Sequence, residues 1–197
     1  DPEYLVPQVN LGNLFLEMAK LNDSVAWYRY ALDRDDTCLP ALIGLGNAYC
    51  QQKVYEAGEQ ALHQAIEIAP NSAEAHCNLS HLYLATDKPE LALKHATRAI
   101  QLRPGFAEAL SNLGLAQKEL GDLGSAIKSL RAAVDAKENF TPALANLAIL
   151  LKADGQLKEA LAIYRQAMAS APNDPVPAYN ASLILLQLGE FEYGWQL

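Results

Sequence analysis

Basic residues are scarce in this sequence. Its 197 residues include 15 Lys and Arg against 23 Asp and Glu, which gives a formal net charge of −8 at pH 7. Because nucleic acids are bound through a basic surface that meets their phosphates, we expect no nucleic acid partner. The acidic excess lies in residues 1–80, which hold 4 Lys and Arg and 11 Asp and Glu. We expect that part of the surface to repel acidic partners.

Long hydrophobic runs are also missing. A membrane-spanning helix needs roughly 18 or more apolar residues in succession, and no stretch of this chain approaches that length. The densest run, residues 181–188, is short and contains Gln187. We therefore expect no membrane segment, and the 51% of residues that are hydrophobic remain available for a buried core.

Cysteine is rare, and the sequence motifs of catalysis are absent. Cys38, Cys50 and Cys77 are too few for a disulfide framework, and an odd number is typical of a reducing compartment, which favours the cytoplasm. Cys50, Cys77 and His81 could form part of a metal site, but no fourth ligand is evident, so we predict no metal and no cofactor. The sequence contains no P-loop, H-E-x-x-H, G-x-S-x-G or G-x-G-x-x-G motif. This segment is thus not expected to be an enzyme, and no catalytic residue is assigned.

What the sequence does contain is a gapless repeat of 34 residues. With Leu5 as position 1, positions 8 and 20 are always small and position 27 is always alanine in the copies that reach it. The three series are Gly12, Gly46, Ser80, Gly114, Ala148 and Ser182; Ser24, Gly58, Ala92, Ala126, Ala160 and Gly194; and Ala31, Ala65, Ala99, Ala133 and Ala167. Small residues at positions 8 and 20 predict two antiparallel helices in close contact, and position 27 predicts where the next repeat docks.

The repeat predicts an all-α fold, a right-handed α-solenoid of stacked antiparallel helix pairs. First helices are expected near residues 7–19, 41–53, 75–86, 107–120, 141–154 and 175–188, and second helices near 23–35, 55–68, 89–102, 123–136, 157–170 and from 191 onward. Gly121, Gly155 and Gly189 suit a left-handed turn between the two helices. His76 is predicted to be packed in the core, whereas His63 and His95, on second helices, are predicted to be solvated.

Repeat boundaries follow from the same numbering. Five complete units are predicted at residues 5–38, 39–72, 73–106, 107–140 and 141–174. Residues 1–4 match the tail of a preceding repeat, and residues 175–197 match a truncated sixth. Because natural arrays end in polar capping helices, we interpret the chain as a piece of a longer array.

The pattern resembles the tetratricopeptide repeat (TPR) over the whole chain. The resemblance implies a superhelix whose first helices line a concave groove that binds a protein or peptide. Asparagine at position 6 of every copy except Gly44 resembles the asparagine ladder of O-GlcNAc transferases. The C-terminal segment Phe191–Trp195 resembles an F-x-x-G-W segment of bacterial TPR proteins, some of which carry a glycosyltransferase-like domain downstream.

Positions 6 and 9 of the first helices are the predicted ligand contacts. A side-chain amide offers one donor and one acceptor to a peptide unit, and helices stacked about 8–10 Å apart would present one amide to about every third residue of an extended peptide. The predicted ligand-binding residues are Asn10, Asn13, Asn47, Asn78, His81, Asn112, Leu115, Asn146, Ile149, Asn180 and Leu183. Alternatively, the asparagines only satisfy local backbone groups or water. Gly44 is expected to leave one position of the ladder empty in either case.

Three functions remain open from the sequence. The first is a protein-interaction scaffold that holds a peptide or partner segment in the groove. The second is the substrate-recruiting arm of a larger glycosyltransferase. The third is a self-assembly module that forms a homo-oligomer through exposed array ends. A basic clamp for acidic peptide tails is missing, because position 5 is never Lys or Arg.

Overall fold

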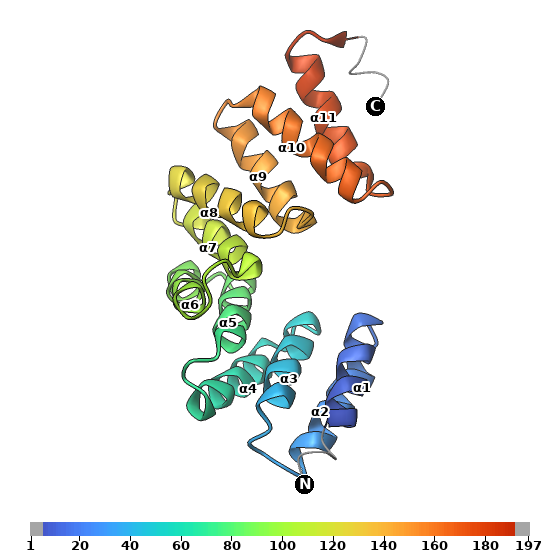
Figure 1. Cartoon of the computed structure of the whole chain (residues 1–197), viewed down its shortest axis with the longest axis vertical. Helices are drawn as coiled ribbons and strands as arrows, with labels where there is room; N and C mark the ends of the chain where they lie inside the picture. The colour runs from blue at the N-terminus through green and yellow to red at the C-terminus, as the bar shows by residue number, and fades with distance from the viewer. Residues whose placement is uncertain (1–5, 192–197) are drawn as a thin grey trace. The chain divides into compact units, whose positions relative to one another are not determined.

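The computed structural model describes residues 6–191, whose regular structure consists of eleven α-helices with no strand (Figure 1). The first helices of the pairs are α1 (Val6–Glu17), α3 (Leu39–Gln51), α5 (Ala73–Ala85), α7 (Ala107–Glu119), α9 (Thr141–Ala153) and α11 (Pro175–Gln187). The second helices are α2 (Leu21–Leu32), α4 (Tyr55–Ile68), α6 (Pro89–Leu102), α8 (Leu123–Ala136) and α10 (Leu157–Ser170). The all-α prediction is confirmed. The F-x-x-G-W segment lies, after Phe191, outside the described residues.

The chain forms two compact units, residues 1–103 with α1–α6 and residues 104–197 with α7–α11. In the first unit the helical hairpins α1/α2, α3/α4 and α5/α6 pack in succession, and the first helices α1, α3 and α5 contact one another in order. In the second unit α7/α8 and α9/α10 form hairpins, α10 contacts α11, and α7 contacts α9. The division into five complete repeats stays a prediction.

Close helix contact explains the small residues at position 8. A Cβ added to Gly46 would lie 2.5 Å from Cγ of Leu62, and one added to Gly114 would lie 2.8 Å from Cγ of Leu130. Atoms cannot approach that closely, so only glycine leaves room for the facing leucine of the second helix. Sequence spacing therefore located the contact between the two helices of each hairpin.

The turn between the helices of a pair is left-handed in every copy. Gly121, Gly155 and Gly189 have φ of +83°, +79° and +80°, as the sequence predicts. Ala19, Lys53 and Asp87 occupy the same repeat position with φ of +55°, +63° and +56°. Since an L-residue with a Cβ is strained in this region, these three turns carry a conformational cost that the glycine turns avoid.

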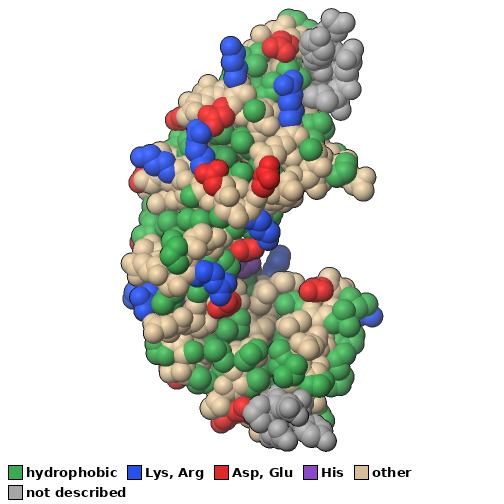
Figure 2. Space-filling view, in the orientation of Figure 1, with side chains coloured by type: hydrophobic (Ala, Val, Ile, Leu, Met, Phe, Trp, Pro, Cys, Tyr) green, Lys and Arg blue, Asp and Glu red, His purple; other side chains and the backbone are tan. Residues whose placement is uncertain are grey.

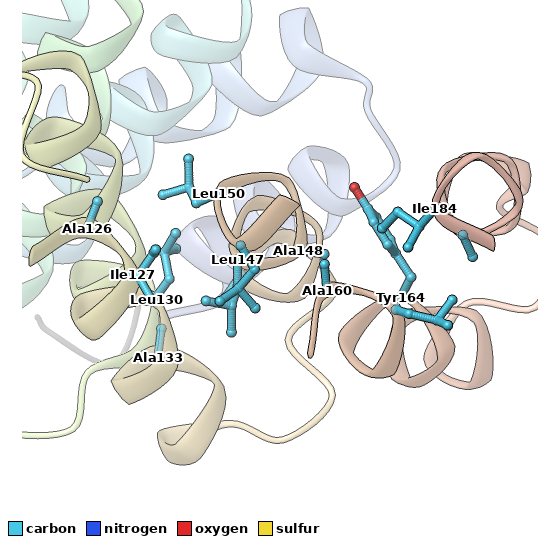
Figure 3. Close-up of a cluster of buried hydrophobic side chains, with 14 of the residues drawn as sticks. Ala126, Ile127, Leu130, Ala133, Leu147, Ala148, Leu150, Ala160, Tyr164 and Ile184 are labelled. Carbon is cyan, nitrogen blue, oxygen red and sulfur yellow. The ribbon is translucent and has the colours of Figure 1, made fainter. Parts of the chain in front are cut away.

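The hydrophobic core of the second unit is built from α8, α9, α10 and α11 (Figure 3). Leu130, Leu147 and Leu151 are almost fully buried in it. Tyr164 lies beside Ile184. The Tyr164 hydroxyl is buried and makes no hydrogen bond among the described residues. Within residues 6–191, no helix combines the length and hydrophobicity needed to span a bilayer.

A pair of histidines joins α5 to α6. Nδ1 of His76 lies 3.0 Å from Nδ1 of His95, and Nε2 of His76 lies 3.2 Å from the carbonyl oxygen of Pro70. Because a carbonyl only accepts hydrogen bonds, His76 carries its proton on Nε2, and His95 donates from Nδ1 to Nδ1 of His76. The predicted burial of His76 is confirmed, but the prediction that His95 is solvated is wrong, since its half-buried ring also packs 5.4 Å from the ring of Tyr83.

Candidate functional site

The first helices of the first unit surround a hollow of about 400 Å³. Side chains from α1, α2, α3, α5 and the loop before α5 line it. The lining residues of this first-unit hollow are Asn13, Leu16, Tyr28, Leu39, Pro40, Ile43, Gly44, Asn47, Ser72, Glu74 and Asn78. Three of the predicted ligand contacts, Asn13, Asn47 and Asn78, thus come together around one cavity.

Tyr28 fills the position where the asparagine series is interrupted. A Cβ added to Gly44 would lie 2.4 Å from Cζ of Tyr28 and 2.7 Å from its hydroxyl oxygen. The ring of Tyr28 is fully buried, and its hydroxyl donates a hydrogen bond of 2.6 Å to Oδ1 of Asn13. The expectation that Gly44 leaves an empty position is therefore wrong, because a side chain from α2 of the preceding hairpin occupies the space.

The sequence contains a signal for this arrangement. Gly44 is the one position-6 residue that is not asparagine, and Tyr28 stands at position 24 of the repeat before it. Tyr164 has the same repeat position as Tyr28, but position 6 of the next copy is Asn180, and the Tyr164 hydroxyl has no partner among the described residues. In this chain, tyrosine at position 24 followed by glycine at position 6 occurs at Tyr28 and Gly44, where the tyrosine hydroxyl reaches Asn13 on α1.

Polar groups on the first-unit hollow are amides rather than free charges. Asn13 accepts from Tyr28 through its oxygen, so its amide nitrogen remains available. Asn47 accepts a long hydrogen bond of 3.4 Å from Nε2 of Gln51, and the Asn78 amide makes no side-chain hydrogen bond with described residues. Donors and acceptors are therefore exposed on the same cavity, as main-chain recognition requires.

Charge among the described residues that line the first-unit hollow is limited to one carboxylate, which is paired with an arginine. Glu74 is the one Asp, Glu, Lys, Arg or His among the described lining residues, and it forms an ion pair with Arg103. On the face shown in Figure 2, described Lys and Arg side chains are scattered among acidic and uncharged ones and form no continuous band. Burial, the main cause, raises the pKa of Tyr28, so its hydroxyl keeps the proton that it donates to Asn13.

Cys50 and His81 form a contact on neighbouring first helices without an activated thiol. Sγ of Cys50 lies 3.5 Å from Nδ1 of His81, and Cys50 is 6% exposed. Burial raises the pKa of the Cys50 thiol, and desolvation lowers the pKa of His81, so both groups are neutral. A neutral, buried thiol is a poor nucleophile. No cluster of three or more His, Cys, Asp or Glu that could hold a metal occurs in the part of the chain that the structure describes.

The other predicted contacts lie outside this hollow. Asn10 is exposed on α1 and His81 on α5. In the second unit Asn112 is buried on α7, Leu115 is half-buried, and Ile149 on α9 is 47% exposed. Asn146 on α9 and Leu183 on α11 are half-buried.

The Asn180 side chain bonds to its own helix, as the alternative interpretation of the asparagine series predicts. Its Nδ2 donates a hydrogen bond of 3.1 Å to the carbonyl oxygen of Val176, one helical turn earlier on α11. The amide thus satisfies a local backbone group. Exposed apolar side chains lie nearby on the same helix, where Val176 and Tyr179 are 56% and 65% exposed.

Comparisons with known proteins agree with this architecture. Three models described as tetratricopeptide repeat match residues 38–105, 77–140 and 143–177. No curated protein sequence gives a match to the chain.

Several solved structures share the fold at low sequence identity. A thermophilic TPR protein of Thermus thermophilus is 22% identical, with a TM-score of 0.81 over 92% of this chain and 99% of that chain. PilF of Pseudomonas aeruginosa is 15% identical, with a TM-score of 0.87 over 99% and 89%. YrrB, a TPR protein with an unusual peptide-binding site, is 22% identical, with a TM-score of 0.62 over 89% and 90%.

Proposed function

Because the chain belongs to the tetratricopeptide repeat family, we propose that it is a protein-interaction scaffold, not an enzyme, and that it binds an extended segment of a partner protein across its first helices. The observation that carries this proposal is the first-unit hollow, where Asn13, Asn47 and Asn78 from three successive first helices surround one cavity. The peptide-binding site of YrrB, which has a similar fold, supports the same class of function.

The amides match the main chain of a peptide in chemistry and in spacing. Each primary amide donates and accepts, as each peptide unit does. Neighbouring packed helices are about 8–10 Å apart, and an extended peptide advances about 3.3 Å per residue, so one amide meets every third residue. Binding through the main chain tolerates many sequences, and the side chains that line the cavity add selectivity.

A selection for peptides tests the proposal. Short random peptides displayed on phage are selected on the immobilised chain, and the enriched peptides are synthesised and titrated by calorimetry. Replacing Asn47 and Asn78 together by alanine should weaken binding by about tenfold, because two hydrogen bonds of about 0.5–1.5 kcal/mol each are lost. Failure to enrich any peptide, or unchanged affinity in the double variant, would contradict the proposal.

A matched double variant controls for nonspecific effects. Gln60 is exposed on α4, and Asn173 is exposed in the loop before α11. Both lie outside the first-unit hollow. Their joint replacement by alanine should leave the affinity unchanged, and circular dichroism should show the same helicity in all three proteins.

A second candidate function, self-association, rests on exposed apolar side chains in the second unit. Val176 and Tyr179 on α11 and Ile149 on α9 are exposed, and such surface is costly to leave in water. Light scattering over a range of protein concentrations tests this candidate, and a strict monomer at every concentration argues against it. The remaining interpretation, an arm of a larger glycosyltransferase, stays a prediction.

A further inference from the structure

We propose that the first-unit hollow is a side-chain pocket, which accepts one apolar, uncharged side chain of the bound peptide beside Gly44, where α3 carries no side chain of its own. The inference rests on the proposed function and deepens it. The scaffold would then select a peptide segment that carries an apolar residue between two main-chain contacts.

The pocket exists because two residues act together. Gly44 places no side chain on the surface of α3 at the point where the other copies carry asparagine. Tyr28 from α2 takes that place, since a Cβ on Gly44 would lie 2.4 Å from its Cζ. The ring of Tyr28 is fully buried and held by its hydrogen bond to Asn13, so the packing beneath the pocket is fixed.

Hydrocarbon forms the walls of the pocket. Leu16 on α1 and Leu39 and Ile43 on α3 are half-buried, and the ring of Pro40 is exposed beside them. Each of these side chains still has apolar surface to cover. Burying an apolar group against them is favourable by roughly 25 cal/mol for each Å² removed from water.

The rim excludes a charged occupant. Asn13, Asn47 and Asn78 are neutral, and the carboxylate of Glu74 is paired with Arg103. A lysine or aspartate side chain that entered would lose hydration and find no free counterion. An uncharged apolar side chain avoids that cost, so charge favours it over the alternatives.

The size of the hollow suits a short piece of peptide. Its volume of about 400 Å³ is near the lower end of the range for ligand pockets, which is about 300–1,000 Å³. Amides on α1, α3 and α5 lie on its rim, so the main chain on either side of the inserted side chain meets a polar group. A single inserted residue would therefore contact the apolar walls, while the main chain on either side of it contacts the amides.

The experiment begins with a peptide selected on the complete chain. Alanine scanning finds its most sensitive position, which is then varied to alanine, leucine, lysine and aspartate. We expect leucine to bind about tenfold more tightly than alanine, since three buried carbon atoms are added, and lysine and aspartate to bind more weakly than alanine. Replacement Ile43→Asn should remove the preference for leucine while the alanine peptide still binds.

Ile68→Asn provides the matched control. Ile68 is 41% exposed on α4 and lies outside the lining residues, so its replacement should preserve the preference for leucine. Nuclear Overhauser contacts between the leucine methyl groups of the peptide and those of Ile43 in the unmodified protein give a second test, which does not depend on how the variants fold.

The outcomes separate the inference from the proposed function. Peptides that bind with no preference for an apolar residue, or with a preference for a charged one, overturn the side-chain pocket and leave the scaffold function standing. A preference for leucine that Ile43→Asn leaves intact, with no contact to Ile43, also overturns it. Absence of any peptide binding overturns both, and binding of a second copy of the chain at this surface would favour self-association instead.

Discussion

The hydroxyl of Tyr28 on α2 donates a hydrogen bond of 2.6 Å to Oδ1 of Asn13 on α1. In this position the ring of Tyr28 packs against Gly12 and Gly44. A Cβ added to these two glycines would lie 2.5 Å and 2.4 Å from atoms of the ring. Buried Tyr28 thus packs beneath the first-unit hollow. Its hydrogen bond occupies the oxygen of the Asn13 amide and leaves the Asn13 nitrogen available for binding.

Tyr28→Phe should lower the stability of the protein, whereas Tyr164→Phe should not. Tyr28→Phe removes a buried hydroxyl that makes a hydrogen bond, so the free energy of unfolding should fall by about 1 kcal/mol. Tyr164→Phe removes a buried hydroxyl without a partner among the described residues, so that free energy should stay the same or rise. Urea denaturation followed by circular dichroism measures both, and equal destabilisation by the two changes would show that the hydrogen bond has no role.

Gly44→Ala should destabilise the first unit by overpacking. The new Cβ has no room beside Tyr28, so the ring must move, and such insertions cost about 1–3 kcal/mol. Gly124→Ala is the control, since Gly124 lies in α8 with no atom closer than 4.0 Å to an added Cβ. That change should stabilise the helix by roughly 0.5–1 kcal/mol. A melting curve of Gly44→Ala that matches the unmodified protein would place Tyr28 elsewhere.

The histidine pair of α5 and α6 should make the protein less stable in acid. Desolvation, together with repulsion from His76, Lys94 and His63, lowers the pKa of His95 from its ordinary 6.5 to about 4 in the folded protein. The folded state therefore favours the neutral ring. The stability that this preference contributes is present above pH 6.5 and is lost as the pH falls from 6.5 towards about 4.

Melting temperatures across that range check the pH dependence. His95→Phe keeps a ring against Tyr83 but removes the titrating group, so its melting temperature should fall less than that of the unmodified protein. His63 is exposed on α4, so His63→Gln serves as a control. This change should have little effect on how the melting temperature varies with pH. The neighbouring charged residues Glu59 on α4 and Arg98 on α6 are the same in all three proteins, so they do not cause a difference between the curves. Parallel curves for the unmodified protein and His95→Phe would argue against a contribution from the pair.

Relief of backbone strain should stabilise the turn after α3. Lys53 has φ of +63°, a conformation that costs an L-residue about 1–2 kcal/mol and glycine almost nothing. Lys53→Gly should therefore raise the free energy of unfolding by about 0.5–1 kcal/mol after the entropy of glycine in the unfolded chain is subtracted. The reverse change at the equivalent position, Gly121→Lys, should lower it by a similar amount in the same denaturation assay.

The helices and their pairing could be predicted from the sequence. Every predicted helix boundary that falls within the described residues lies within three residues of the observed one. The reason is that each repeat places the same residue types at the same helix contacts. The spacing of these residues along the chain therefore predicts which side of a helix packs against its neighbour. Asn13, Asn47 and Asn78 followed from that spacing, and the structure brings them together around the first-unit hollow.

Which side chains fill the space between hairpins was decided only by the tertiary structure. Tyr28 occupies the gap at Gly44, His95 pairs with His76, Asn112 is buried, and the Asn180 amide turns to its own helix. A repeat fixes the direction of each side chain from its helix, but the space beyond it depends on the size and polarity of residues brought from the neighbouring hairpin. Those contacts are set by packing in three dimensions, and the spacing along the chain does not contain them.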